Sequence, residues 1–101
     1  MLVITGFLTF RPEDVYEVVE GLLAVSELSR KDPGCIDYWW AEDLERPYTF
    51  RFFEAWETAE QFEAHRGMPY EDAFNERYLP KLVDVDAHVY TVTARASALG
   101  M

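Results

Sequence analysis

The sequence predicts an α+β protein of the ferredoxin-like split βαββαβ type, in which a four-stranded antiparallel sheet carries its helices on one face. Two observations predict this fold class. The chain has 101 residues, of which 50% are hydrophobic and 28% are charged, a balance typical of one globular domain. Segments rich in β-branched and aromatic residues alternate with segments of helical periodicity, in the order strand, helix, strand, strand, helix, strand.

The first part of the chain predicts one strand and one helix. Residues 2–10, LVITGFLTF, are rich in strand-forming residues and too few for a typical helix, so we expect a strand. Pro12 suits a first helical turn, and apolar residues follow it at helical spacing: Val15, Val18, Val19, Leu22 and Val25 or Ser26. The turn Asp32-Pro33-Gly34 is expected to end this helix.

The middle of the chain predicts a hairpin followed by a helix. Residues 35–42 and 48–56 are rich in strand-forming residues, and the polar link 43–47 between them is short and contains a proline. These features favour an antiparallel hairpin. Thr58 and Gln61 have the spacing of a capping box, so a helix is expected to begin at Thr58.

The last part of the chain predicts a broken helix and a final strand. Gly67-Met68-Pro69 interrupts the helix, and Pro80 ends a second helical stretch. Residues 82–93 are expected to form a strand with Val83, Val85, Ala87 and Val89 on one side and Asp84, Asp86 and His88 on the other. The small-residue tail, 94–101, is expected to be flexible, and residues 1–101 to form a single domain.

The first three strands carry large apolar side chains on both faces, although two helices can cover only one face. Phe7, Trp39 and Phe53 alternate with other apolar residues of their strands. Leaving several such rings in water would forgo several kcal/mol, at about 25 cal/mol per Å². We therefore predict a homodimer that packs sheet against sheet. The alternative is an exposed aromatic face that binds a ligand or a different protein.

Composition and charge exclude several classes of function. Nine Lys and Arg against 19 Asp and Glu give a net charge of −10, which disfavours nucleic acid and anionic membranes as partners. Cys35 is the only cysteine, so no internal disulfide forms, and a reducing compartment is favoured. No apolar run approaches the roughly 18 residues of a spanning helix, and the N-terminus lacks a basic signal-peptide segment. A cytoplasmic location is expected.

The sequence lacks the common cofactor and hydrolase motifs. It contains no GxGxxG, GxxxxGK[ST], CxxC, HExxH or GxSxG pattern. A metal site would need a carboxylate such as Glu54, Asp84 or Asp86 beside His65 or His88, and no spacing forces these residues together. No metal ligands are therefore predicted.

His65, Tyr70 and Tyr78 are the candidate catalytic residues. His65 falls three residues after Phe62, so it is expected to face inward or to lie at the border of its helix. A neutral imidazole in an apolar cleft can act as a base near pH 7. The alternative is a packed histidine bonded to a backbone carbonyl. Tyr70 and Tyr78 share a helix face, where either could orient a substrate oxygen or simply lie at a rim.

Aromatic residues are the candidate substrate-binding side chains. Trp56 is expected to pack beneath the helix that begins at Thr58, as core or as the wall of a hollow for a flat ligand. Phe52, Phe62 and Phe74 would add apolar walls.

Other polar and reactive residues are assigned structural roles. Cys35 is expected to be a small buried hydrophobe, and Arg51 and Glu54 to form pairs across strands or within the dimer. His88 is expected on a solvated or ion-paired surface.

The segments DPGCIDYWW and FFEAWETAEQFEAH resemble the antibiotic biosynthesis monooxygenase family of dimeric α+β barrel proteins. The element order matches over roughly residues 2–93. The Pro-Gly-Cys turn is moderately specific. The better signature is Glu54-x-Trp56 followed by His65 nine residues after the tryptophan.

The resemblance implies a homodimer with a pocket between sheet and helices in each subunit, lined by Trp56 and edged by His65. It also implies oxygenation of phenolic or quinol-like substrates by O₂ without flavin, haem or metal. Two positions depart from the family pattern. Phe52 stands where antibiotic-tailoring members carry an asparagine, and about Gly6 is where haem-degrading members carry one, so haem breakdown is not expected.

The leading functional hypothesis is a cofactor-independent monooxygenase acting on a small aromatic, quinol or polyketide-like molecule. His65 would be its base or oxyanion stabiliser, and Tyr70 or Tyr78 would orient the substrate. One alternative is a non-catalytic ligand-binding or assembly module, and another is a non-redox isomerase on the same scaffold. Inward-facing titratable groups would favour an enzyme.

Overall fold

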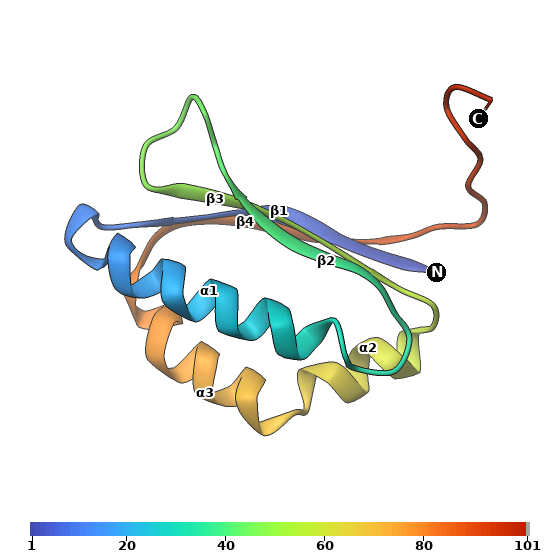
Figure 1. Ribbon diagram of the computed structural model, residues 1–101, viewed down its shortest axis with the longest axis horizontal. Helices are drawn as coiled ribbons and strands as arrows, with labels where there is room; N and C mark the ends of the chain where they lie inside the picture. The colour runs from blue at the N-terminus through green and yellow to red at the C-terminus, as the bar shows by residue number, and fades with distance from the viewer. Residues whose placement is uncertain (101) are drawn as a thin grey trace.

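The computed structural model describes residues 1–100 and contains the strands and helices in the predicted order (Figure 1). The α-helices lie on one side of the sheet. The elements are β1 (Leu2–Phe10), η1 (Pro12–Asp14), α1 (Val15–Ser29), β2 (Cys35–Glu42), β3 (Thr49–Trp56), α2 (Ala59–Arg66), α3 (Pro69–Tyr78), η2 (Leu79–Lys81) and β4 (Leu82–Thr91).

The sheet is antiparallel throughout, with the strand order β2-β3-β1-β4. The first strand therefore lies in the interior of the sheet, between the third and the fourth. Leu2 faces Trp56 of β3 on one side and Thr91 of β4 on the other. This is the strand order of the ferredoxin-like split βαβ arrangement, so the predicted fold class is confirmed.

The helix boundaries follow local signals in the sequence. Thr58 caps α2, because its Oγ1 accepts a hydrogen bond from the backbone N–H of Gln61 at 3.1 Å, as the capping-box spacing predicts. Pro69 opens α3 after the predicted break. Pro12 opens a short 3₁₀ turn instead of the α-helix itself, which begins at Val15.

Three strand predictions need correction. The third strand begins at Thr49, because Tyr48 has a φ of 59° and lies in the left-handed region, which a strand does not accommodate. Val83 falls outside the predicted alternation of the last strand, because a register shift places Phe10 opposite Leu82 and Thr9 opposite Asp84. That strand ends at Thr91 instead of residue 93.

Residues 92–100 form neither helix nor strand and are mostly exposed. The backbone N–H of Val92 still donates to the carbonyl oxygen of Met1 at 2.8 Å. Flexibility of the predicted tail stays a prediction, and its last residue, Met101, lies outside the described residues. Within residues 1–100, no helix combines the length and the hydropathy needed to cross a membrane.

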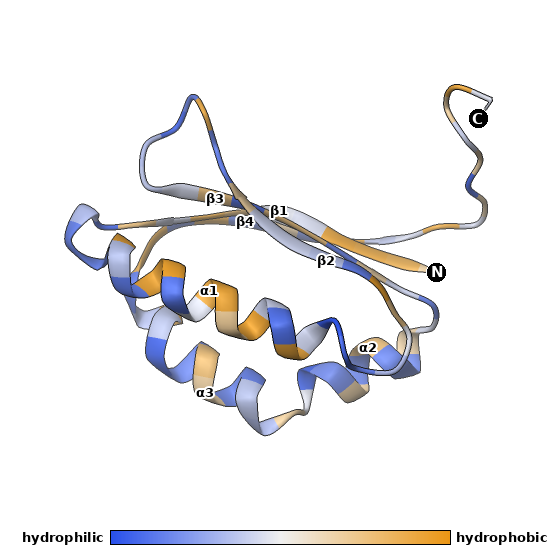
Figure 2. Ribbon diagram, viewed as in Figure 1, coloured by the Kyte–Doolittle hydropathy of each residue, from blue (hydrophilic) through white to orange (hydrophobic). Residues whose placement is uncertain are grey.

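The core lies between the sheet and α1. Hydrophobic residues recur along α1 and the strands, whereas α2 and α3 are mostly hydrophilic (Figure 2). The side chains buried here come from alternate positions of the strands and from one face of α1: Ile4, Leu8, Phe10, Tyr38, Phe50, Phe52, Trp56, Val18, Leu22 and Val25. This spacing is the signature of a sheet with one face packed on a helix.

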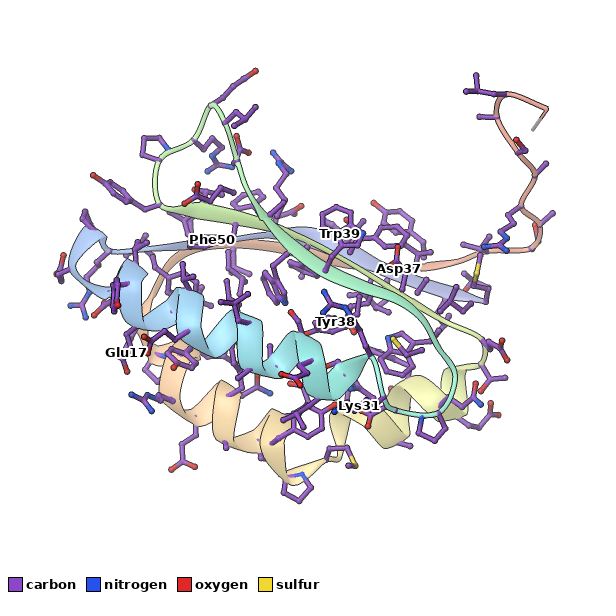
Figure 3. All side chains as sticks on the ribbon, viewed as in Figure 1. Glu17, Lys31, Asp37, Tyr38, Trp39 and Phe50 are labelled. Carbon is purple, nitrogen blue, oxygen red and sulfur yellow. The ribbon has the colours of Figure 1, made fainter. Side chains whose placement is uncertain are left out.

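The opposite face of the sheet, which we call the open face, also carries aromatic rings. Tyr38 points toward the helices, whereas Trp39 lies on the other side of the sheet (Figure 3). Trp39 stacks on Phe53 at 5.7 Å and remains 39% exposed. The guanidinium of Arg46 lies 4.1 Å from the ring centre of Phe7. The predicted presence of apolar groups on both faces is therefore confirmed.

Candidate active site

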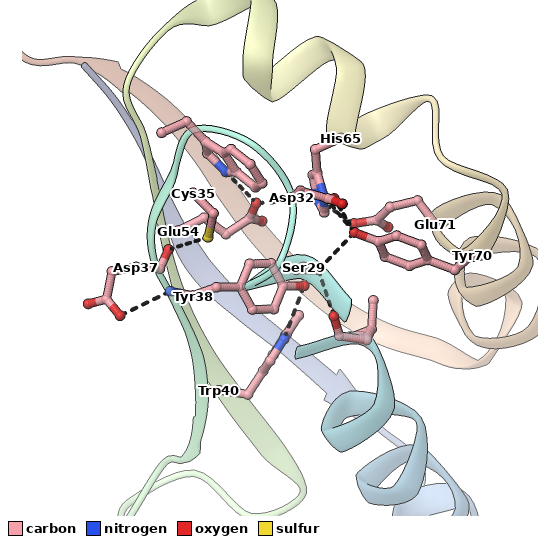
Figure 4. Close-up of polar contacts among 12 residues, drawn as sticks. Ser29, Asp32, Cys35, Asp37, Tyr38, Trp40, Glu54, His65, Tyr70 and Glu71 are labelled. Carbon is pink, nitrogen blue, oxygen red and sulfur yellow. Dashed lines mark hydrogen bonds and ion pairs between the residues drawn. The ribbon is translucent and has the colours of Figure 1, made fainter. Parts of the chain in front are cut away.

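A cluster of titratable side chains joins the helices to the sheet (Figure 4). His65 comes from α2 and Glu54 from β3, while Tyr70 and Glu71 come from the first turns of α3. Asp32 belongs to the turn that follows α1. The turn, the strand and the two helices thus bring together groups that are scattered in the sequence.

His65 lies at the centre of this cluster, with its side chain only 1% exposed. Its Nδ1 lies 3.0 Å from Asp32 Oδ2 and 3.0 Å from the hydroxyl oxygen of Tyr70. Its Nε2 lies 2.6 Å from Glu71 Oε1. The expectation of an inward-facing histidine is thus met, but the partners are carboxylates and a phenol, not the backbone carbonyl considered as the alternative.

The surrounding charges favour a protonated imidazole. Burial alone lowers the pKa of His65, but hydrogen bonds to Glu71 and Asp32, with the nearby charge of Glu54, outweigh burial and raise the pKa above its usual value. Both ring nitrogens then donate to carboxylates. A histidine in this state stabilises negative charge and has no free lone pair with which to accept a proton.

Glu54 is the carboxyl group most affected by burial. Its side chain is 13% exposed, and its Oε1 accepts a hydrogen bond from Trp56 Nε1 at 3.1 Å. Burial raises the pKa of Glu54, and the bond from Trp56 and the charge of His65, whose Nε2 lies 3.7 Å away, only partly oppose this rise. Glu54 is therefore the carboxylate of this cluster best suited to accept a proton.

Tyr70 is the tyrosine that reaches the cluster. Its hydroxyl donates to Asp32 Oδ2, and Ser29 Oγ lies 3.4 Å away. Burial, followed by the bond to Asp32, raises the pKa of Tyr70, so this phenol stays protonated and acts as a donor. The Tyr78 hydroxyl lies 3.4 Å from the carbonyl oxygen of Glu17 and not in the cluster, although Tyr70 and Tyr78 line a separate cleft of about 240 Å³ together with Phe74.

The predicted aromatic walls divide into two groups. Trp56 is fully buried beneath α2, as expected, with its ring centre 4.6 Å from that of His65 and 6.3 Å from that of Phe62. Phe52 and Phe74 instead lie against Trp40, at 4.9 and 6.5 Å. Trp56 is closed off from solvent and forms core around the cluster.

Three other expectations can be compared with the structure. Cys35 is partly buried, and burial together with the charges of Glu54 and Asp32 raises its pKa to about 11, so it is a neutral thiol at pH 7. Arg51 pairs with Asp43 at 2.8 Å and not with Glu54. His88 is exposed and pairs with Asp86 at 2.8 Å.

No joint metal site of the two histidines forms. His88 pairs with Thr5 in the sheet register and so lies on the open face, whereas His65 lies beneath the helices. Over residues 1–100, no three His, Cys, Asp or Glu side chains are grouped so that they could hold a metal ion.

A cleft of about 240 Å³ opens between α1 and the edge strand β2. Trp40 lines it, and Trp40 Nε1 donates to the Tyr38 hydroxyl at 3.4 Å. The ring of Tyr38 lies 6.0 Å from that of His65, so one packed aromatic pair separates the cleft from the cluster. Burial, followed by the charge of Glu54, raises the pKa of Tyr38.

The sequence did not identify Asp32, Glu71 or the cleft. The sequence marks Asp32 only as part of a turn, and a glutamate in a first helical turn is common because it suits the helix dipole.

The glycine at position 6 has a clear structural reason. A Cβ atom at this position would lie 1.9 Å from the carbonyl oxygen of Asp86, so β4 would have to shift to admit any side chain.

The chain is similar to known proteins in sequence and in fold. An uncharacterized protein of Synechocystis sp. is 32% identical over 76 residues, which are 75% of this chain and 52% of that protein, so the chain spans about half the length of this relative. A candidate antibiotic biosynthesis monooxygenase of Deinococcus radiodurans superposes with a TM-score of 0.89 at 20% identity, covering 96% of this chain and 97% of its own.

Rv0793 of Mycobacterium tuberculosis superposes with a TM-score of 0.86 at 21% identity, covering 95% of this chain and 98% of its own. At such identities the two structural matches show the fold alone. The family model described as antibiotic biosynthesis monooxygenase matches residues 1–77, which include the Pro-Gly-Cys turn, Trp56, His65 and the residues around them. The chain therefore belongs to the antibiotic biosynthesis monooxygenase family.

Proposed function

We propose that this protein is a cofactor-independent monooxygenase that oxidises a small aromatic, quinol or polyketide-like substrate with O₂. The observation that carries the proposal is the buried cluster of His65, Asp32, Glu54, Tyr70 and Glu71, in a member of this family. Perturbed titratable groups concentrate at functional sites. His65 and Tyr70 both face inward, which supports an enzyme over a purely structural module.

The proposed reaction needs little from the protein. An electron-rich aromatic supplies its own electrons once a proton is removed, so the protein must accept that proton, stabilise the anion and exclude water. One oxygen atom enters the substrate and the other leaves as water. No flavin, haem or metal takes part in the proposed scheme.

The cluster suggests how the roles divide. We assign the protonated His65 to stabilisation of the substrate oxyanion through its positive charge, because Asp32 and Glu71 already engage both of its ring nitrogens. Glu54 is the proton acceptor, and Tyr70 becomes the orienting donor when its O–H turns from Asp32 to the substrate. Phe52, Phe62, Phe74 and Trp56 supply apolar surroundings, and Tyr78 is not given the orienting role because its hydroxyl lies at the carbonyl oxygen of Glu17.

We also propose that the protein is a homodimer packed through the open face. Phe7, Trp39, Phe53 and Tyr90 give that face an aromatic surface, and Trp39 and Tyr90 are 39% and 52% exposed. A second copy is the simplest cover for such a surface. Sedimentation equilibrium should give twice the chain mass of 11.8 kDa, and a lone chain at high concentration would contradict the proposal. A cytoplasmic location stays a prediction.

Oxygen uptake tests the proposed reaction. The purified chain, treated with chelator, should consume O₂ with at least one member of a panel of quinols and anthrones, and should be inactive without O₂. His65→Ala should abolish uptake, whereas Tyr16→Ala, a change at an 82% exposed residue of α1 away from the open face, should not. Binding without uptake would favour the ligand-binding module, and turnover without O₂ would favour an isomerase. Full activity of His65→Ala would remove His65 from the mechanism.

A further inference from the structure

The cleft between α1 and β2 has the walls of a small-molecule site. Its apolar lining includes Val19, Leu22, Leu23, Trp40 and Phe50, and its polar lining consists of Ser26, Arg30 and Glu42. Its volume of about 240 Å³ lies below the 300–1,000 Å³ of sites for drug-sized ligands, so one or two fused rings would fill it. The indole of Trp40 offers a flat surface on which such rings can stack.

Arg30 differs from most other basic residues of the chain. The sequence has nine Lys and Arg, and within residues 1–100 all except Arg30 and Arg95 form an ion pair: Arg11, Lys31, Arg46, Arg51, Arg66, Arg77 and Lys81. With 19 carboxylates and nine cations, some carboxylates must remain without an ion pair, whereas every arginine could have one. Arg30 lines the cleft, where an anion from outside the chain can be its partner.

The guanidinium of Arg30 is also held in place. Its Nε donates to the backbone carbonyl oxygen of Tyr38 at 3.0 Å, which ties the end of α1 to the edge strand β2. The terminal amino groups remain as donors with the fork geometry that matches a carboxylate. Glu42 in the same cleft and the acidic rest of the protein repel anions, so binding would depend strongly on Arg30.

We propose that this cleft binds a small planar aromatic anion, such as a one- or two-ring carboxylate or phenolate, with Arg30 on the anionic oxygen and Trp40 against the ring. The binding claim stands by itself. The claim that the bound molecule is the substrate rests on the proposed function, and it requires Trp40 and Tyr38 to move, because this pair separates the cleft from His65.

The test compares two ligands of one shape, 2-naphthoate and the neutral 2-naphthamide, titrated against the full chain with tryptophan fluorescence and calorimetry. Naphthoate should bind more tightly than naphthamide. Arg30→Gln should weaken naphthoate by about tenfold or more, since hydrogen bonds to charged groups are strong, and should leave naphthamide within about twofold. Arg95→Gln removes the other unpaired cation, with the same change in net charge, and should alter neither affinity.

A second variant keeps the test decisive if Arg30→Gln does not fold. Leu23 is 67% exposed, so Leu23→Asp should fold and place a negative charge at the cleft, weakening naphthoate more than naphthamide. No binding of naphthoate, equal effects on both ligands, or a loss with Arg95→Gln alone would overturn the proposal. These titrations need no O₂. Binding of naphthoate, together with no oxygen uptake on the panel of quinols and anthrones, would therefore support the cleft proposal and contradict the monooxygenase proposal.

Discussion

His65 Nε2 and Glu71 Oε1 lie 2.6 Å apart, across the break between α2 and α3. The histidine belongs to the last turn of α2 and the glutamate to the first turn of α3, so their contact fixes the bend at Gly67 and Met68. Both side chains are largely buried. Removing one member of such a pair leaves a buried charge without its partner, which typically costs about 3–5 kcal/mol.

The first prediction concerns the pH dependence of stability. His65 has a pKa raised above its ordinary value of roughly 6.5, so its stabilisation is complete below that value and is lost as the pH rises through the folded-state pKa. In a His88→Gln background, the remaining histidine should titrate above roughly 6.5 by proton NMR, and the urea midpoint should fall over the same pH range. Titration below 6.5 would mean that burial outweighs the carboxylates.

Glu54→Gln should stabilise the protein at neutral pH. Burial raises the folded-state pKa of Glu54, so the protein loses stability as the pH rises from the ordinary glutamate pKa through the folded-state pKa. The amide oxygen of glutamine can still accept the Trp56 hydrogen bond. The melting temperature at pH 8 should rise by a few degrees, about 4–8 °C per kcal/mol, with little gain below pH 4. Glu57→Gln, at a neighbouring exposed position, is the control and should change little.

Trp56→Phe should destabilise the protein through Glu54. The substitution keeps an aromatic ring in the core but removes the indole N–H that bonds Glu54 Oε1 at 3.1 Å. A hydrogen bond to a charged group contributes about 1.5–3 kcal/mol, and urea unfolding should show a loss of that order. In Glu54→Gln the same change should cost less, because the acceptor is then neutral. Equal losses in both backgrounds would show that packing alone matters.

Gly21→Ala should destabilise the protein, whereas Gly67→Ala should not. Alanine is favoured over glycine within helices by about 1 kcal/mol, yet a Cβ at Gly21 in α1 would lie 2.5 Å from the buried ring of Tyr78. Gly67 is the C-cap of α2 with a φ of −86°, which alanine also adopts, and a Cβ there would meet its nearest atom at an ordinary 3.6 Å. Thermal melts should show a loss for Gly21→Ala and no loss for Gly67→Ala; stabilisation by both would contradict the close packing of α1 on Tyr78.

Much of the fold could be predicted because its signals are local. The alternation of apolar residues, the Thr58 cap and the Gly67-Met68-Pro69 break each act within a few residues. The boundaries that were wrong depend on the path of the backbone: Tyr48 enters β3 from a left-handed conformation, and the β1–β4 register shifts at Phe10.

The candidate site could be predicted only in part. The spacing from Phe62 is enough to predict that His65 faces inward. Asp32 lies 33 residues from His65 in the sequence and contacts it only through the tertiary fold. Arg30 and Glu71 are residue types that usually lie in water, so nothing in the sequence marks them.

The strand order also determines how the sheet responds to force. Leu2 and Thr91 are opposite each other in the β1–β4 ladder, so the first residue of β1 and the last residue of β4 lie at the same end of this antiparallel pair. Tension applied between these two residues would separate the hydrogen-bonded residue pairs one after another from that end, instead of loading all the pairs at once. β1 and β4, which are the first and last strands of the chain, should therefore separate at low force when they are pulled from this end.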